Sequence, residues 1–324
     1  MSPTSTGTPA STTPRALGST GLQVTPLAFG TSPLASMSNL YGYAVDEERA
    51  VATVRAIFDG SVTLLDTSNG YGEDGTAERR IGIAVREAGG LPPGLVLSTK
   101  VDPDKHTGDF SGERVRRSLE ESLERLGVDR VPLLHLHDPE RMEFADAIKP
   151  GGAVPALVEL RERGLVDHLG VAGGPVDVLR DYLGTGEFEV VLSHNRATLL
   201  DRSVLPLFDE AAERGIGVLN AAPYGGGMLS KGPDVQPKYG YGIRGDEVAD
   251  AATRMQEVCA RAGVPLAAAA LQFSMRLPSV HSTVVGVSSP ERVAQTLELA
   301  AVEIPDEVWE QLERLVPDAS GWLG

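Results

Sequence analysis

The sequence has 324 residues, of which 41% are hydrophobic, and its formal net charge at pH 7 is -16. So acidic a balance argues against nucleic acid or an anionic membrane surface as a partner. The single cysteine, Cys259, excludes an internal disulfide, and no apolar run reaches the roughly 18 residues that a membrane-spanning helix needs. The N-terminus lacks the apolar segment of a signal peptide, so we expect a cytoplasmic protein.

The first part of the chain predicts a tail followed by a hairpin. Residues 1–14 are rich in Ser, Thr and Pro, and we expect them to be disordered. Residues 15–24 predict a short hairpin that turns between Gly18 and Gly21. From there on, strand and helix patterns alternate. The expected strands are 27–31, 62–66, 95–100, 130–137, 168–172, 188–193, 216–221 and 282–286. The expected helices are 46–60, 74–89, 111–126, 153–163, 175–184, 203–214, 246–262, 265–275, 290–300 and 305–315.

This alternation predicts a single (α/β)8 barrel of the TIM type over residues 15–324. Parallel strands that are joined by helices need both faces of their sheet covered, and eight such units close a barrel. The N-terminal hairpin and the last helix, 305–315, are additions to that plan. A doubly wound open sheet is the competing fold, but no G-x-G-x-x-G pattern follows the first strand.

Three consecutive expected strands end in ionisable side chains. Asp66 ends one strand and Tyr71 follows it in a Gly-flanked loop; Lys100 and His137 end the next two strands. Active sites of α/β barrels gather at the carboxyl ends of the strands, so these four side chains are expected to meet. A tyrosine hydroxyl has a pKa near 10 and needs a neighbouring cation to exchange protons at neutral pH. Lys100 would be that cation, Asp66 would hold it in place, and His137 could share the proton or orient a substrate carbonyl.

Four motifs in this order resemble the aldo-keto reductase family. They are residues 17–24 with 29–31, 66–72, 98–100 and 136–139, and the likeness extends over roughly residues 15–315. The resemblance implies an (α/β)8 barrel and an NAD(P)-linked oxidoreductase, with Asp66, Tyr71, Lys100 and His137 as the catalytic tetrad. Residues 136–140, 195–201 and 266–273 are similar to the aldose 1-dehydrogenases of the D-threo-aldose or L-fucose type. This narrower likeness implies that an aldose is oxidised at C1 to the lactone; reduction of small aldehydes or ketones is the alternative.

The last strand-to-helix turn, residues 284–292, fits a dinucleotide. Ser288 and Glu291 have the spacing of a capping box, or Ser289 caps the helix with Pro290 at its first position. In both arrangements the helix N-terminus faces a phosphate, and Arg292 is placed to meet an adenosine 2′-phosphate. An ordinary capped helix is the alternative. The residues expected to bind the cofactor are Gly30, Asn195, Gly286, Ser288, Ser289 and Arg292.

The chain departs from the family pattern where the nicotinamide is held. The family usually has Ser-Asn after the fifth strand, where this chain has Ala172 and Gly173. It often has a stacking tyrosine where this chain has Ala221, and a glutamine where Val191 is expected to stand. Asn195 could take over the contact with the nicotinamide amide.

Two other classes of function stay open. His135 and His137, with His194 and Asp66, could ligate zinc in a metal-dependent hydrolase, although we read His135 as a buried side chain one layer below His137. Alternatively the barrel could be a non-catalytic subunit that binds the cofactor. We expect no metal, a small-molecule substrate (a sugar or an aldehyde), and a monomer or small homo-oligomer.

Overall fold

The computed structural model describes residues 12–240, 242–243 and 245–324. Most of the predicted disordered tail, residues 1–14, therefore lies outside the described residues. The predicted hairpin is confirmed: β1 (Arg15–Ala16) pairs antiparallel with β2 (Gln23–Val24), and Gly18 and Gly21 in its turn have positive φ angles.

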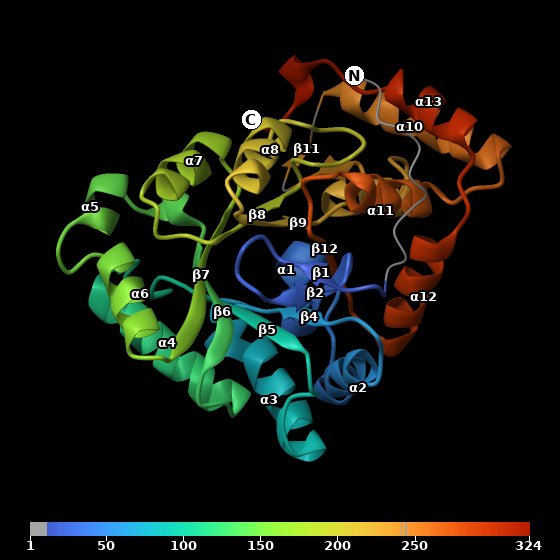
Figure 1. The fold of residues 1–324 in the computed structure, drawn as a ribbon. Helices are drawn as coiled ribbons and strands as arrows, with labels where there is room; N and C mark the ends of the chain where they lie inside the picture. The colour runs from blue at the N-terminus through green and yellow to red at the C-terminus, as the bar shows by residue number, and fades with distance from the viewer. Residues whose placement is uncertain (1–11, 241, 244) are drawn as a thin grey trace.

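The predicted barrel is confirmed. Eight parallel strands close on themselves in the order β12-β3-β4-β5-β6-β7-β8-β9, with helices around the outside (Figure 1). Their bounds are β3 Leu27–Gly30, β4 Leu64–Asp66, β5 Val96–Val101, β6 Val131–His137, β7 Val166–Gly173, β8 Val190–His194, β9 Gly217–Ala221 and β12 Ser282–Gly286. Every predicted barrel strand is present, with ends shifted by no more than two residues from the prediction.

The longer helices also lie where the apolar period predicts them. They are α2 Glu47–Phe58, α3 Thr76–Ala88, α4 Gly112–Leu126, α6 Ala153–Glu162, α7 Val176–Gly184, α8 Leu205–Glu213, α10 Asp246–Arg261, α11 Leu266–Arg276, α12 Pro290–Ala301 and α13 Asp306–Glu313. Their ends follow ordinary capping rules: the side chain of Asp46 accepts from the Arg49 N–H at the start of α2, and Gly127 ends α4 in the left-handed conformation.

Short elements inside the loops were not predicted. They are α1 (Ser38–Tyr41), α5 (Phe144–Ile148), α9 (Met228–Lys231) and a two-residue hairpin of β10 (Lys238–Tyr239) and β11 (Gly242–Ile243). Elements this short carry too few residues to show a period, so the sequence pattern could not distinguish them from loop.

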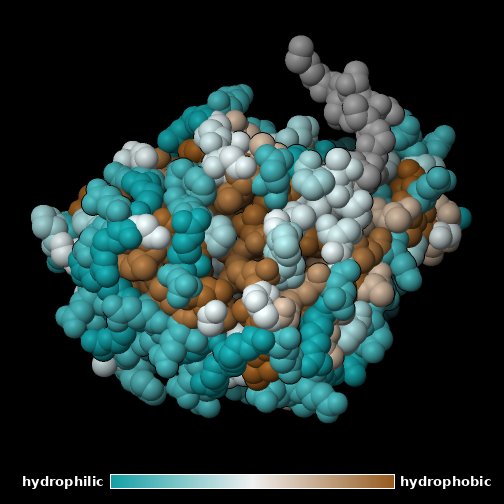
Figure 2. Space-filling view, turned by 60° about the horizontal axis from the view of Figure 1, so that its bottom comes forward, coloured by the Kyte–Doolittle hydropathy of each residue, from teal (hydrophilic) through white to brown (hydrophobic). Residues whose placement is uncertain are grey.

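The strand pleat divides the apolar side chains into two layers. Leu64, Val96 and Leu133 point into the barrel and pack on one another. The residues after them, Leu65, Leu97 and Leu134, point outward against the helices. Because side chains alternate, every second residue toward a strand's carboxyl end lies at the inner mouth of the barrel. On the face that Figure 2 shows, hydrophilic side chains surround a central band of hydrophobic ones.

Candidate active site

The structure brings the four predicted side chains together at the carboxyl ends of the strands. Asp66 and His137 are the last residues of β4 and β6, and Lys100 lies one residue before the end of β5. Each has the same parity as an interior leucine or valine of its strand, so it points into the mouth. Tyr71 reaches the same place from the loop after β4, and its ring meets the His137 ring edge-on at 5.7 Å.

Lys100 connects the acid to the tyrosine. Its Nζ atom lies 2.6 Å from Asp66 Oδ2, 2.6 Å from the Thr67 carbonyl oxygen and 3.3 Å from the Tyr71 hydroxyl oxygen. The ammonium also lies 4.8 Å from the centre of the Tyr71 ring. Lys100 is 1% exposed and Asp66 3%, so water screens this charge pair little. The arrangement places a fixed cation beside a phenolic oxygen, where it favours the phenolate.

His137 has a partner that the sequence analysis missed. Its Nδ1 atom lies 2.7 Å from Asp102 Oδ1, and Asp102 follows β5 directly. The other carboxylate oxygen, Oδ2, accepts from the Gly70 N–H at 2.7 Å and from the Ser68 hydroxyl. A Cβ atom on Gly70 would lie 2.5 Å from Asp102, so the glycine leaves room for this carboxylate. An available signal was that Asp102 lies two residues after Lys100, at the mouth-facing parity.

Asp102 and His137 shift each other's pKa values. Burial raises the pKa of Asp102, but the charge of His137 and the hydrogen bonds from His137, Ser68 and Gly70 lower it more, to about 2. Burial lowers the pKa of His137, but the charges of Asp102 and Asp138 outweigh burial and the opposing charge of Lys100, so this pKa is raised. An imidazolium at this position therefore persists to higher pH than in an exposed histidine.

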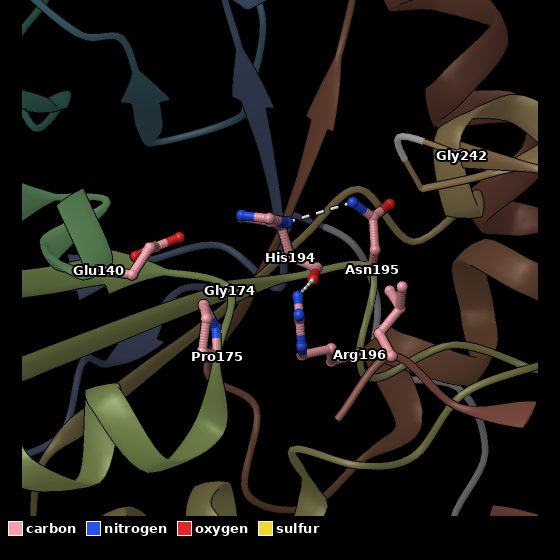
Figure 3. A pocket seen from close by; sticks show the side chains of 8 residues that line it. Glu140, Gly174, Pro175, His194, Asn195, Arg196 and Gly242 are labelled. Atoms are coloured by element: carbon pink, nitrogen blue, oxygen red, sulfur yellow. Dashed lines mark hydrogen bonds between the residues drawn. The ribbon is translucent and has the colours of Figure 1, made fainter. Parts of the chain in front are cut away.

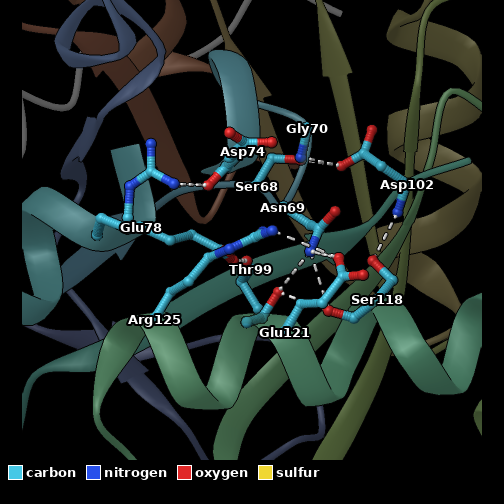
Figure 4. A network of polar contacts seen from close by, with 12 residues as sticks. Ser68, Asn69, Gly70, Asp74, Glu78, Thr99, Asp102, Ser118, Glu121 and Arg125 are labelled. Atoms are coloured by element: carbon cyan, nitrogen blue, oxygen red, sulfur yellow. Dashed lines mark hydrogen bonds and ion pairs between the residues drawn. The ribbon is translucent and has the colours of Figure 1, made fainter. Parts of the chain in front are cut away.

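Helix α4 supports the loop that carries Tyr71 (Figure 4). Arg114 binds Glu121 through two hydrogen bonds, donates to the Asn69 side chain at 3.0 Å and donates to the Asp102 carbonyl oxygen at 3.1 Å. Asn69 in turn donates to the Ser118 carbonyl oxygen. One guanidinium thus links the Tyr71 loop to the residue that holds His137. The sequence analysis missed this network because its members are distant in sequence and share no motif.

Two further histidines lie near the mouth and are neutral at ordinary pH. His135 is fully buried, as predicted, and burial with the charge of Lys100 lowers its pKa well below the usual value. His194, the last residue of β8, has its pKa lowered to about 4 by burial; Asp138 opposes this, while Arg196, His137 and Lys100 add to it.

A cavity of about 390 Å³ lies beside these groups at the ends of β7 and β8 (Figure 3). The polar side chains that line it are Glu140, His194, Asn195 and Arg196. The Asn195 Nδ2 atom lies 3.1 Å from His194 Nδ1, whereas Asn195 Oδ1 is buried and has no hydrogen-bond partner among the described residues. A buried acceptor without a partner is costly, so it indicates a place for a donor from a bound molecule.

Backbone strain gathers at the same edge of the barrel. Asp138, Asn195 and Ala222 have φ angles of 43°, 61° and 52°, a region that residues other than glycine rarely adopt. They directly follow β6, β8 and β9. Strained residues persist where the surroundings fix them, and they cluster at ligand sites.

The predicted phosphate turn is a capped helix start, and the structure distinguishes the two capping arrangements. Ser289 is the N-cap of α12, and its hydroxyl accepts from the Arg292 N–H, with Pro290 at the first helical position. Arg292 is exposed. Glu291 pairs with Arg49 of α2 at 3.0 Å. Ser288 is half-buried in the preceding turn.

Two predicted glycines lie side by side at the mouth. Gly30 and Gly286 are register partners at the ends of the adjacent strands β3 and β12. Gly30 is buried and Gly286 is exposed. Neither carries a side chain that would keep a ligand away from the backbone.

The expected departures at the nicotinamide position are seen in part. Ala172 and Ala221 do face the barrel interior, so neither offers a polar contact there. The expectation for Val191 is wrong: this side chain packs outward among the helices, because its parity on β8 is opposite to that of Leu192 and His194. The inward polar group at the end of β8 is His194 instead.

The zinc alternative finds no support in the geometry. Within the described ranges, no group of three or more His, Cys, Asp or Glu side chains is placed to hold a metal ion.

No single described helix is long and apolar enough to cross a membrane, and only α10 with α11, bent by 102°, passes that test as a pair.

Comparison with known proteins identifies the family. The model of the Aldo/keto reductase family matches residues 26–317. The chain belongs to the aldo/keto reductase family. This reductase is 32% identical to the D-threo-aldose 1-dehydrogenase of a Pseudomonas species, over 95% of its own length and 99% of that protein. It is 33% identical to the L-galactose dehydrogenase of Arabidopsis thaliana, over 93% of both chains.

A solved structure shows the same fold. The holo form of aldo-keto reductase AKR11C1 from Bacillus halodurans superposes with a TM-score of 0.77 at 23% identity, over 96% of this chain and 98% of that one. Family membership and the dehydrogenase relatives identify this reductase as an NAD(P)-dependent oxidoreductase. The buried Asn195 acceptor, which has no partner among the described residues, and the absence of side chains at Gly30 and Gly286 fit such a cofactor.

Proposed function

We propose that this protein oxidises an aldose at C1 to the lactone, with Tyr71 as the general acid and base. The observation that carries the proposal is the buried contact of Lys100 with both Asp66 and the Tyr71 hydroxyl, next to His137. The two aldose-acting relatives, each covered over more than nine-tenths of its length, support an aldose as substrate.

The reaction removes a hydride from C1 of the cyclic sugar and a proton from its C1 hydroxyl. NAD(P)⁺, when bound, supplies the acceptor for the hydride that leaves C1. Tyr71 takes the proton of the C1 hydroxyl, and Lys100 stabilises the phenolate that accepts it. The C1–H and O–H bonds break, the C1=O bond of the lactone forms, and the Tyr71 proton passes on to solvent. His137 holds the substrate oxygen through the ring nitrogen that faces away from Asp102.

The cofactor would lie across the mouth from α12 to β8. In this proposal Ser288, Ser289 and Arg292 meet its phosphates, and Gly30 and Gly286 let it approach the backbone. Asn195 Oδ1 accepts from the nicotinamide amide, a contact that Ala172 and Ala221 cannot make.

The surroundings of the site favour a neutral polyhydroxy substrate. Asp138 and Glu140 follow β6, and the cavity is lined by one carboxylate, Glu140, and one guanidinium, Arg196, so it offers no excess of positive charge to a sugar acid or sugar phosphate. Tyr41 and Tyr43, whose ring centres are 5.8 Å apart in the loop after β3, offer aromatic surface of the kind that packs against a pyranose.

A substrate panel tests the proposal. Wild-type protein is incubated with L-fucose, D-arabinose and L-galactose plus NAD⁺ or NADP⁺, and with simple aldehydes plus the reduced cofactors, and the nicotinamide absorbance is followed. We expect turnover of at least one aldose, with lactone or its acid as product. If no aldose is oxidised while simple aldehydes are reduced efficiently, the aldose proposal fails and the protein is a general carbonyl reductase.

A further inference from the structure

Asp102 stands outside the predicted tetrad but is built into the site. The carboxylate is 3% exposed and lies directly after β5. It accepts hydrogen bonds from His137 Nδ1, the Gly70 N–H and the Ser68 hydroxyl. Two of these three partners belong to the loop that carries Tyr71, so Asp102 fixes the histidine and the tyrosine loop to each other.

The chemistry of this carboxylate determines which ring nitrogen of His137 carries the proton. An ionised carboxylate only accepts hydrogen bonds, so the nitrogen 2.7 Å from it must be an N–H. With a pKa of about 2, Asp102 is ionised at any pH of use. The other nitrogen, Nε2, has Asp138 Oδ1 at 3.7 Å, which is beyond hydrogen-bond distance. Nε2 is therefore the nitrogen available to a substrate oxygen.

We propose that Asp102 is a positioning residue that keeps His137 in the Nδ1–H form, so that the lone pair of Nε2 meets the substrate oxygen beside Tyr71. The inference rests on the proposed function of the site. In its neutral form, Nε2 accepts a hydrogen bond from the C1 hydroxyl of the sugar, and the single proton of that hydroxyl then passes to Tyr71 during oxidation. As imidazolium, it donates to the carbonyl oxygen in the reverse reaction. No other described group contacts Nδ1 with a full negative charge.

The charged groups around His137 predict how the activity should depend on pH. Asp102 and Asp138 favour the imidazolium, and Lys100 disfavours it. His135 and His194, which also feel the charge of His137, are neutral at ordinary pH and add no charge there. The pKa of His137 is raised, so the acid side of the oxidation profile should lie at a higher pH than an exposed histidine would give.

The substitution Asp102→Asn separates this role from mere packing, because the two side chains have nearly the same shape. The Gly70 N–H can only donate, so the amide oxygen of the new side chain must face it. The amide NH₂ then faces His137 Nδ1, which must become the acceptor, and the proton moves to Nε2. A matched control is Asp104→Asn on the same loop, because among the described residues that carboxylate accepts only from His106 and Thr107, in its own turn.

The experiment measures the tautomer directly and without substrate. ¹⁵N-histidine spectra of the wild type are recorded, with the His137 signal assigned by its loss in His137→Gln. We expect Nδ1–H in the wild type and in Asp104→Asn, and Nε2–H in Asp102→Asn. For Asp102→Asn we also expect kcat/KM to fall by about 10²–10⁴-fold. The acid limb of its pH profile should move to lower pH, and cofactor affinity should be unchanged.

Several outcomes would overturn the inference. A neutral His137 ring in the wild type that carries its proton on Nε2 and none on Nδ1 does so even if the variant fails to fold. Wild-type turnover and an unshifted pH profile in folded Asp102→Asn do so as well. The substrate proposal fails separately: if no aldose is a substrate but carbonyl reduction shows the same dependence on Asp102, the inference stands and the aldose assignment falls.

Discussion

The ammonium of Lys100 lies 2.6 Å from Asp66 Oδ2, and both side chains are almost completely buried. Burying such a pair costs desolvation energy that its attraction only partly returns, so the pair is weak evidence for a role in stability. The ion pair also has a chemical consequence, because the Tyr71 hydroxyl oxygen lies 3.3 Å from the Lys100 ammonium. The first two predictions follow from this contact.

Replacing Tyr71 with phenylalanine should remove most of the activity. The change deletes the hydroxyl that contacts Lys100 and keeps the ring that packs against His137. We expect kcat to fall by about 10²–10⁴-fold, with cofactor affinity, measured by nicotinamide fluorescence, nearly unchanged. Tyr182→Phe is the matched control, because its hydroxyl is buried without a partner in the described structure and lies among Phe144 and Phe188. A kcat close to the wild-type value in Tyr71→Phe contradicts the assignment.

Replacing Lys100 with methionine should move alcohol oxidation to higher pH. Without the ammonium, the phenolate of Tyr71 loses its nearest positive charge and forms less readily. The single change also leaves Asp66 buried and unpaired, at a cost of about 3–5 kcal/mol, so it is best made together with Asp66→Asn. The pH dependence of kcat is compared between the wild type and the double variant Lys100→Met with Asp66→Asn. An unchanged profile in the active double variant would show that the cation does not tune Tyr71.

The positions of three candidate catalytic residues could be predicted because each follows from strand geometry. Asp66, Lys100 and His137 end strands whose apolar runs are clear, and the period of two sets which way each points. The same period shows why Val191 does not take the family position: its parity on β8 is opposite to that of the interior Leu192, so it points outward. Parity is thus a stronger guide than likeness where strand ends are concerned.

The partners of these residues could not be predicted. Asp102 faces His137 only because the barrel closes β5 against β6, and Arg114 reaches Asn69 only because α4 packs under the loop. Such pairs join residues that are 35 and 45 positions apart without a shared motif. Long-range pairing of side chains depends on the packed structure, which no local pattern contains.

The substitution Arg114→Lys should loosen the loop that carries Tyr71. Lysine keeps the charge but cannot make the paired bonds to Glu121 together with those to Asn69 and the Asp102 carbonyl oxygen. We expect the free energy of unfolding to fall by about 1–3 kcal/mol and kcat to fall more than KM rises. Arg117→Lys, on the same helix and exposed, is the control. Equal effects of the two substitutions on kcat would contradict the supporting role.

His194 should make the protein less stable as the pH falls. Its folded-state pKa is about 4, below the unfolded value of 6.5. Both states are therefore neutral above pH 6.5, whereas between 6.5 and 4 only the unfolded state takes up the proton. The contribution to stability lost over this range is roughly 3 kcal/mol. Denaturant titrations of the wild type and His194→Gln at several pH values measure this loss. If the free energy of unfolding falls equally with pH in both proteins, His194 is not the group responsible.

The most direct test of the central claim follows the hydrogen on C1. An aldose that is turned over is prepared with deuterium at C1 and incubated with the protein and NAD⁺ or NADP⁺, and both products are analysed by mass spectrometry. We predict that the deuterium appears in the reduced nicotinamide and that the sugar product is the unlabelled lactone or its acid, with neither formed by Tyr71→Phe. A reduced cofactor without deuterium, or a sugar product that keeps its C1 deuterium, would contradict oxidation at C1 by this site.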